Sequence, residues 1–234
     1  MILSELLYPK RCPVCLDPLF PGETLICPEC KEKLRLVRQP VCYLCGKPLS
    51  DGSREYCHNC EKRKPSFEKG LSWAEYTSFY VRRMMGEAKY RGNCQILDYP
   101  CLDLVNRHKN EILSWHANAL VPVPVHEEKR LVRGYNQAAE IAYRLSSHLS
   151  IPVDEGALVR TENTKAQKDL SEQLRFENLL RAFQVPDHSV IHDTVILVDD
   201  IYTTGSTAEC CTRALLSSGV RKVYVLTLSI GRDF

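Results

Sequence analysis

The sequence has no long apolar run and little net charge. No stretch approaches the roughly 18 consecutive apolar residues that a membrane-spanning helix requires, so we expect no membrane span. Glu5 interrupts the first residues where a secretory signal would be continuously apolar, so we expect a cytoplasmic protein. A formal net charge of +2 over 234 residues is too small for a basic nucleic-acid coat protein but leaves room for a local basic groove.

Cysteine, in contrast, is abundant. The chain has 12 cysteines, and eight of them form four Cys-x-x-Cys pairs that recur every 15 residues near the N-terminus. Without an export signal we expect a reducing compartment, where such pairs bind metal rather than form disulfides. The repeat predicts a duplicated metal-binding knuckle with eight thiolate ligands: Cys12, Cys15, Cys27, Cys30, Cys42, Cys45, Cys57 and Cys60.

The spacing within each pair lets both thiolates of a tight turn face one ion, and two turns complete a tetrahedral four-sulfur site for Zn²⁺. Sequential pairing, in which the first two pairs share one ion, is the simplest arrangement, and a cross-braced pairing is the alternative. Pro13, Pro28 and Gly46 in or beside the knuckles favour zinc ribbons over an iron–sulfur cluster. Such closed sites serve folding rather than catalysis, because a segment this short with few large apolar side chains needs metal for stability.

A composition change divides the chain. The charged run 61–64 is followed by Pro65 and predicts a linker, so we assign residues 1–64 to a double zinc ribbon and residues 65–234 to an α/β domain. Apolar periodicity predicts alternating strands and helices, which is typical of a parallel sheet flanked by helices. The strands are expected at 70–76, 119–125, 194–198 and 221–228, and the helices at 81–90, 97–113, 136–149, 170–180 and 205–218.

The most informative segment follows the strand expected at 194–198. Two carboxylates, Asp199 and Asp200, end this strand, and a loop of hydroxyl-bearing residues leads into a helix. Ligands bind at the carboxyl ends of parallel strands, and backbone N–H groups at a helix N-terminus suit a phosphate monoester. The bland alternative is a helix cap preceded by acids. We favour phosphate binding by the loop residues and ribose binding by the carboxylates; the loop consists of Thr203, Thr204, Gly205, Ser206 and Thr207.

This segment resembles the motif with which type I phosphoribosyltransferases bind 5-phosphoribosyl-1-pyrophosphate (PRPP). The shared pattern is four apolar residues, two acids, two further residues and Thr-Thr-Gly-x-Thr; Tyr202 stands where an aliphatic residue is usual. The resemblance implies a parallel five-stranded core with a smaller hood, and PRPP bound together with Mg²⁺. It also implies that Asp199 and Asp200 hold the ribose while 203–207 hold its 5′-phosphate.

Further segments make the chain similar to the ComF/GntX family. They are Val-Pro-Val-Pro-Val-His at 121–126, Lys-Arg-Leu-Val-Arg-Gly-Tyr-Asn-Gln at 129–137, Lys-Tyr-Arg-Gly-Asn at 89–93, and the polar stretches 164–170 and 175–178. The N-terminal double zinc ribbon also belongs to this pattern. The resemblance implies a role in natural competence, the uptake of single-stranded DNA, as well as the phosphoribosyltransferase-like fold.

Two arginines complete the candidate site. Arg130 and Arg133 follow the strand expected at 119–125, and arginine suits bidentate contacts with a pyrophosphate. A basic surface turn is the alternative interpretation. In a transfer reaction, Asp199 and Asp200 would stabilise positive charge at the ribose C1 while the arginines neutralise the leaving pyrophosphate.

Two functions of different class follow. The first is transfer of phosphoribose from Mg²⁺-bound PRPP to an acceptor that the sequence does not identify. The second is binding of single-stranded DNA alongside DNA-uptake proteins, with the PRPP pocket silent or regulatory. Both need phosphate recognition, so one pocket can serve either function.

Overall fold

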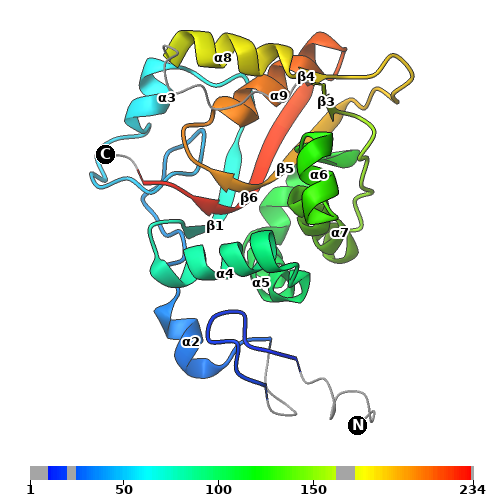
Figure 1. The fold of residues 1–234 in the computed structure, drawn as a ribbon. Helices are drawn as coiled ribbons and strands as arrows, with labels where there is room; N and C mark the ends of the chain where they lie inside the picture. The colour runs from blue at the N-terminus through cyan, green and yellow to red at the C-terminus, as the bar shows by residue number, and fades with distance from the viewer. Residues whose placement is uncertain (1–9, 20–24, 162–171, 233–234) are drawn as a thin grey trace.

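The computed structural model describes residues 10–19, 25–161 and 172–232 (Figure 1). Its centre is a parallel sheet in the order β1-β6-β5-β2. The predicted fold class, a parallel sheet flanked by helices and preceded by cysteine ribbons, is confirmed. The strands are β1 (Gly70–Glu75), β2 (Ala119–Pro122), β5 (Thr194–Tyr202) and β6 (Lys222–Ile230).

The implied fifth strand is not present in the described part of this sheet. A single parallel bridge joins Val153 to Leu120 of β2. The Leu120 N–H donates to the carbonyl of Pro152 at 2.8 Å, and the Asp154 N–H donates back to Leu120 at 2.9 Å. Pro152 has no N–H of its own, so it cannot donate a ladder hydrogen bond. The expectation of five strands is therefore corrected to four strands and one bridge.

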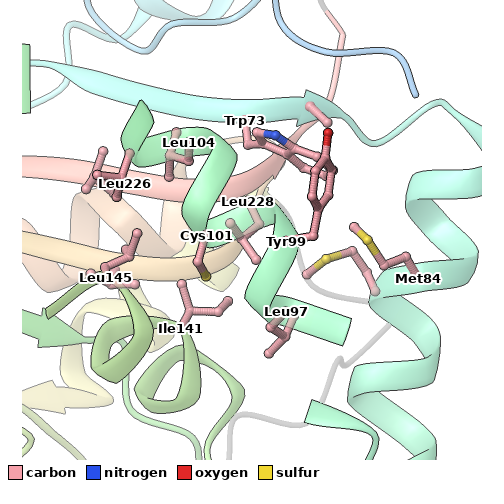
Figure 2. Close-up of a cluster of buried hydrophobic side chains, with 14 of the residues drawn as sticks. Trp73, Met84, Leu97, Tyr99, Cys101, Leu104, Ile141, Leu145, Leu226 and Leu228 are labelled. Atoms are coloured by element: carbon pink, nitrogen blue, oxygen red, sulfur yellow. The ribbon is translucent and has the colours of Figure 1, made fainter. Parts of the chain in front are cut away.

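Alternation along the strands builds two apolar layers. Ile196 and Val198 of β5 face one cluster of buried side chains, whereas Val195 and Leu197 face the other. Figure 2 shows the first cluster, which packs helical side chains such as Leu104 and Leu145 against the sheet. Three helices supply this cluster: α4 (Phe79–Arg91), α5 (Asp98–Ser114) and α7 (Gln137–Leu149). The opposite cluster is supplied by α8 (Glu172–Arg181) and α9 (Ser206–Ser217).

The predicted strands and helices all appear, with ends shifted by a few residues. The segment after β2 contains a helix, α6 (Glu127–Arg133), that the apolar periodicity did not predict. The ring of His126 accepts the Glu128 N–H at 3.3 Å and caps this helix. The short elements that periodicity did not predict are η1 (Cys94–Leu97) and the antiparallel pair β3 (Val159–Arg160) and β4 (Phe183–Gln184).

The ribbon segments join the sheet at its edge and on one face. Their short helices are α2 (Pro28–Lys33) and α3 (His58–Lys62). Between the ribbons, Leu36 forms an antiparallel bridge with Ala74 and so covers the edge of β1. The backbone of the second ribbon packs closely on the start of β1, because the Gly70 N–H donates to Leu44 at 2.6 Å. Whether residues 1–64 fold apart from 65–234 stays a prediction.

Candidate functional site

The ribbon cysteines form two four-sulfur clusters, one in each ribbon. Within each cluster all sulfur atoms lie within 4.8 Å of one another. The Sγ–Sγ distance is 3.9 Å between Cys15 and Cys27 and 3.6 Å between Cys45 and Cys57. Zinc–sulfur bonds of about 2.3 Å in a tetrahedron place the sulfurs about 3.8 Å apart, so both clusters fit Zn²⁺. The sequential pairing is confirmed and the cross-braced one is wrong: the clusters are Cys12, Cys15, Cys27, Cys30 and Cys42, Cys45, Cys57, Cys60.

The two adjacent aspartates lie inside the last part of β5 and face different surroundings. Successive strand residues point to opposite faces of a sheet. The Asp200 carboxylate accepts an ion-pair hydrogen bond from Lys89 Nζ of α4 at 3.0 Å. On the α9 side, Asp199 lines a small cavity together with Thr203 and Thr207. The pair therefore links the two helical layers at the carboxyl edge of the sheet.

The electrostatics of Asp199 differ from those of an exposed carboxylate. Burial raises the pKa of Asp199 well above its ordinary value, and the neighbouring charge of Asp200 raises it further. The Asp200 N–H, which donates to Asp199 Oδ1 at 2.8 Å, and the Lys89 ammonium only partly oppose this shift. A carboxyl group whose charge is this unfavourable in the free protein is typical of a site that acts on ligands.

The hydroxyl-rich loop 203–207 begins α9. Gly205 has φ +84°, and a Cβ at this position would collide with the hydroxyl of Tyr202. Thr203 and Thr204 are exposed, and Thr204 Oγ1 lies 3.1 Å from Ser206 Oγ. The cavity between Asp199 and the loop has about 20 Å³, room for one water. A phosphate would therefore lie over the exposed loop hydroxyls rather than inside this cavity.

Cationic side chains converge on the acid pair from different elements. Lys89 comes from α4, Lys129 and Arg133 from α6, and Arg160 from β3. Burial lowers the pKa of Lys129, and the charges of Arg160, Arg133 and Lys89 lower it further. Burial also lowers the pKa of Arg160, which Asp199 partly opposes. This crowding of like charges favours binding of an anion between them.

The predicted arginines have different positions. Arg133 is half-buried with its guanidinium 5.9 Å from the centre of the Tyr90 ring, and it belongs to the cationic group. Arg130 is exposed on α6, and no side-chain hydrogen bond or ion pair joins it to the acids in the described part of the chain. Nearby, Gln137 begins α7 with a buried side-chain amide that has no hydrogen-bond partner in the described part of the chain.

Residues from the ribbon and from β3 were missed as site candidates. Lys47 is only 2% exposed, and its Nζ donates to the Thr203 carbonyl at 3.3 Å, at the base of the hydroxyl-rich loop 203–207. Phe67 packs edge-on against Tyr202 with ring centres 6.2 Å apart. Arg160 follows no recognisable motif. The segment 89–93 was noted for its family resemblance, but nothing in it indicated Asp200 as the partner of Lys89.

Comparison with known proteins identifies the family. Residues 3–61 match the protein family described as the double zinc ribbon domain. Competence protein ComFC of Bacillus subtilis is 30% identical over 210 residues, covering 86% of this chain and 82% of the relative. The chain belongs to the ComF family. Competence protein F of Haemophilus influenzae is 29% identical over 94% of this chain and 96% of its own. The DNA utilization protein YhgH of Escherichia coli K12 is 28% identical, with coverage of 95% and 98%.

The two cysteine clusters of this ComF-family chain agree with the match to the double zinc ribbon. A purine phosphoribosyltransferase from Pyrococcus horikoshii overlaps 57% of this chain and 81% of its own at 15% identity, with a TM-score of 0.33, too low to support an inference. None of the described helices combines the length and apolar character needed to cross a bilayer. The polar stretch 164–170 from the sequence analysis lies outside the described residues.

Proposed function

We propose that this ComF-family protein binds PRPP with Mg²⁺ at the carboxyl edge of β5 and transfers its phosphoribosyl group. The observation that carries the proposal is the Asp199–Asp200 pair, which lies between the phosphate loop and the cationic group. In this assignment the carboxylates hold the ribose hydroxyls and the loop holds the 5′-phosphate. The cations Lys89, Lys129 and Arg133 neutralise the pyrophosphate. Arg130, the other predicted arginine, joins them only if α6 moves toward the ligand.

The chemistry assigned to these residues is electrostatic. The bond between ribose C1 and the pyrophosphate oxygen breaks, and pyrophosphate leaves with the electron pair. A nitrogen nucleophile of the acceptor forms the new bond to C1 and then loses its proton. Asp199 and Asp200 stabilise the positive charge that develops on the ribose. Mg²⁺ would be held by pyrophosphate and ribose oxygens, because this ion keeps waters and seldom needs a protein cage.

Calorimetry with Mg²⁺ and PRPP on zinc-loaded protein tests the proposal. We expect binding by the wild type and a loss of at least about 100-fold in the Asp199→Asn/Asp200→Asn variant, because two charge-assisted contacts disappear. Asp187→Asn, which alters an exposed carboxylate, should bind like the wild type. No PRPP binding by the wild type, or equal binding by the double variant, refutes the assignment.

One observation favours a second function, binding of single-stranded DNA in the cytoplasm together with DNA-uptake proteins. Tyr90 is 77% exposed and carries the Arg133 guanidinium over its ring, next to Lys89 in the sequence. Single-strand binding combines such aromatic platforms with a cationic groove. The names of the competence and DNA-utilization relatives point the same way.

Fluorescence anisotropy with a labelled oligothymidylate at several salt concentrations tests this function. We expect affinity to fall steeply with salt and Tyr90→Ala to weaken binding by about fivefold or more, because one stacked base is lost. Tyr43 of the second ribbon is a matched control. It is 65% exposed, and the centre of its ring lies 5.4 Å from Lys69 Nζ. Equal effects of Tyr90→Ala and Tyr43→Ala contradict a stacking role at the site.

A further inference from the structure

A larger cleft lies between the second zinc ribbon and the phosphate loop. Its volume is about 590 Å³, within the range typical of small-ligand sites. One wall comes from α3 and the residues after it, and the other comes from the start of α9 with Thr204, Gly205 and Ser206. Neither Asp199 nor Asp200 is among the described residues that line it. An occupant would therefore touch the phosphate loop without contacting the carboxylates assigned to the ribose.

The lining of the cleft is rich in basic side chains. Lys62, Arg63, Lys64 and Arg213 line it, against Glu209 and the zinc-ligand thiolate of Cys60. The Glu209 carboxylate already accepts the Ser66 backbone N–H and hydroxyl, each at 2.7 Å, and the Arg213 guanidinium at 2.6 Å. The Glu209 carboxylate is therefore already satisfied by donors within the wall. The remaining excess of positive charge favours a compact polyanion.

The walls are fixed to each other before any ligand arrives. The Ser66–Glu209 hydrogen bonds join the chain after α3 to α9. Lys47 Nζ joins the ribbon to the Thr203 carbonyl at 3.3 Å, and the Phe67 and Tyr202 rings pack between them. Because these contacts already fix the walls, binding costs little conformational entropy of the protein. Even a small ligand, which makes few contacts, can therefore bind.

We propose that this cleft is a second anion site that binds a small polyphosphate, of the tripolyphosphate or nucleoside triphosphate class. It goes beyond the ribose-phosphate site, because its basic residues and the acid pair belong to different surfaces. The shared loop couples the two sites: a polyphosphate that engages Thr204 and Ser206 from the cleft competes for the same hydroxyls as a 5′-phosphate. Occupancy of the cleft should therefore weaken PRPP binding.

Calorimetry with inorganic tripolyphosphate and with ATP on the full zinc-loaded chain tests the proposal. We expect Lys62→Ser/Lys64→Ser to weaken both ligands by at least about tenfold, since two charge-assisted contacts are lost. The matched control is Lys31→Ser/Lys33→Ser, which removes two exposed lysines from the equivalent helix α2 of the first ribbon. The control should bind like the wild type.

The outcomes separate this proposal from the proposed function. Polyphosphate binding that survives Asp199→Asn/Asp200→Asn but falls in Lys62→Ser/Lys64→Ser supports the cleft site, whether or not PRPP binds. No tripolyphosphate or ATP binding by the wild type overturns it, as does equal loss in the Lys31→Ser/Lys33→Ser control. Oligothymidylate binding that depends on Lys62 and Lys64, without tripolyphosphate binding, overturns it in favour of nucleic acid.

Discussion

The two zinc sites should contribute unequally to the rest of the protein, and a matched pair of substitutions tests this. Cys15 and Cys45 occupy the same position of the 15-residue repeat, two units apart. All four ligands of the second site are buried, whereas Cys15 and Cys27 of the first are only half-buried. Both sites share a buried cluster with β5, the first with Ile196 and Val198 and the second with Val195 and Leu197, but the second ribbon also reaches loop 203–207 through Lys47. Cys45→Ser should therefore disturb the sheet more than Cys15→Ser does.

The magnitude follows from the energetics of structural zinc. Binding at such a site contributes about 10–16 kcal/mol, which matches or exceeds the whole stability of about 5–15 kcal/mol of a typical domain. The loss is larger where all four ligands are buried, as in the second site, than where two of them are half-buried, as in the first. We expect Cys45→Ser to lower Tm by at least about 10 °C, since each kcal/mol shifts Tm by about 2–4 °C in a chain of this size. Cys15→Ser should lower it by less than half as much.

Hydrogen exchange locates the damage, and a zinc assay establishes that each variant has lost one ion. In Cys45→Ser we expect lost protection in β5, in 203–207 and in the first turn of α9. In Cys15→Ser the loss should stay within the first ribbon and the neighbouring part of α4. Equal drops in Tm, or unchanged protection of 203–207 in Cys45→Ser, would refute the idea that the second ribbon supports the phosphate loop.

Three further outcomes are expected. Lys47→Met should lower PRPP affinity about tenfold, measured by calorimetry, because a charged hydrogen bond to Thr203 is lost; unchanged affinity contradicts this. Lys89→Met should lower Tm by about 3–6 °C, because the partly buried Asp200 carboxylate loses its ion-pair partner; the same Tm as wild type contradicts it. The raised pKa of Asp199 gives stability that is present below its ordinary value of 3.8 and lost as pH rises through the folded-state pKa. Asp199→Asn should therefore melt higher than wild type at pH 8, with a smaller gap at pH 5.

Local sequence patterns predicted the helices and strands, and those site residues that lie close together in the sequence. The uniformly apolar run 194–198 of β5 and the Cys-x-x-Cys spacing are short-range signals, and both were confirmed. The acid pair and the hydroxyl loop were also visible, because one strand and the following helix carry them all. Helix α6 was missed, since none of its residues is buried and no apolar period marks it. Its cap, a histidine, is not a usual capping residue.

Contacts between distant segments had no such signal. The Lys89–Asp200 ion pair joins residues 111 positions apart, and the Lys47–Thr203 hydrogen bond joins residues 156 apart. Neither lysine lies in a motif that names its partner, and a lysine inside a zinc ribbon is normally expected at the surface. The expectation of a fifth strand was wrong for a different reason. The family resemblance implied a further strand beside β2, but Pro152 limits that pairing to one bridge between Leu120 and Val153.

The duplicated ribbons share their local geometry and differ in their tertiary contacts. Leu16 and Gly46 occupy the same repeat position with φ of +70° and +73°, and each donates its N–H to the first cysteine of its ribbon at 2.9 Å. Only at Gly46 would a Cβ meet the Gly70 carbonyl oxygen, at 2.6 Å, so the second turn requires glycine where the first accepts leucine. The next residue is exposed Asp17 in one ribbon and buried Lys47 in the other. In the second ribbon this position is therefore buried and places one cation against the carbonyl of Thr203, whereas in the first ribbon it stays exposed.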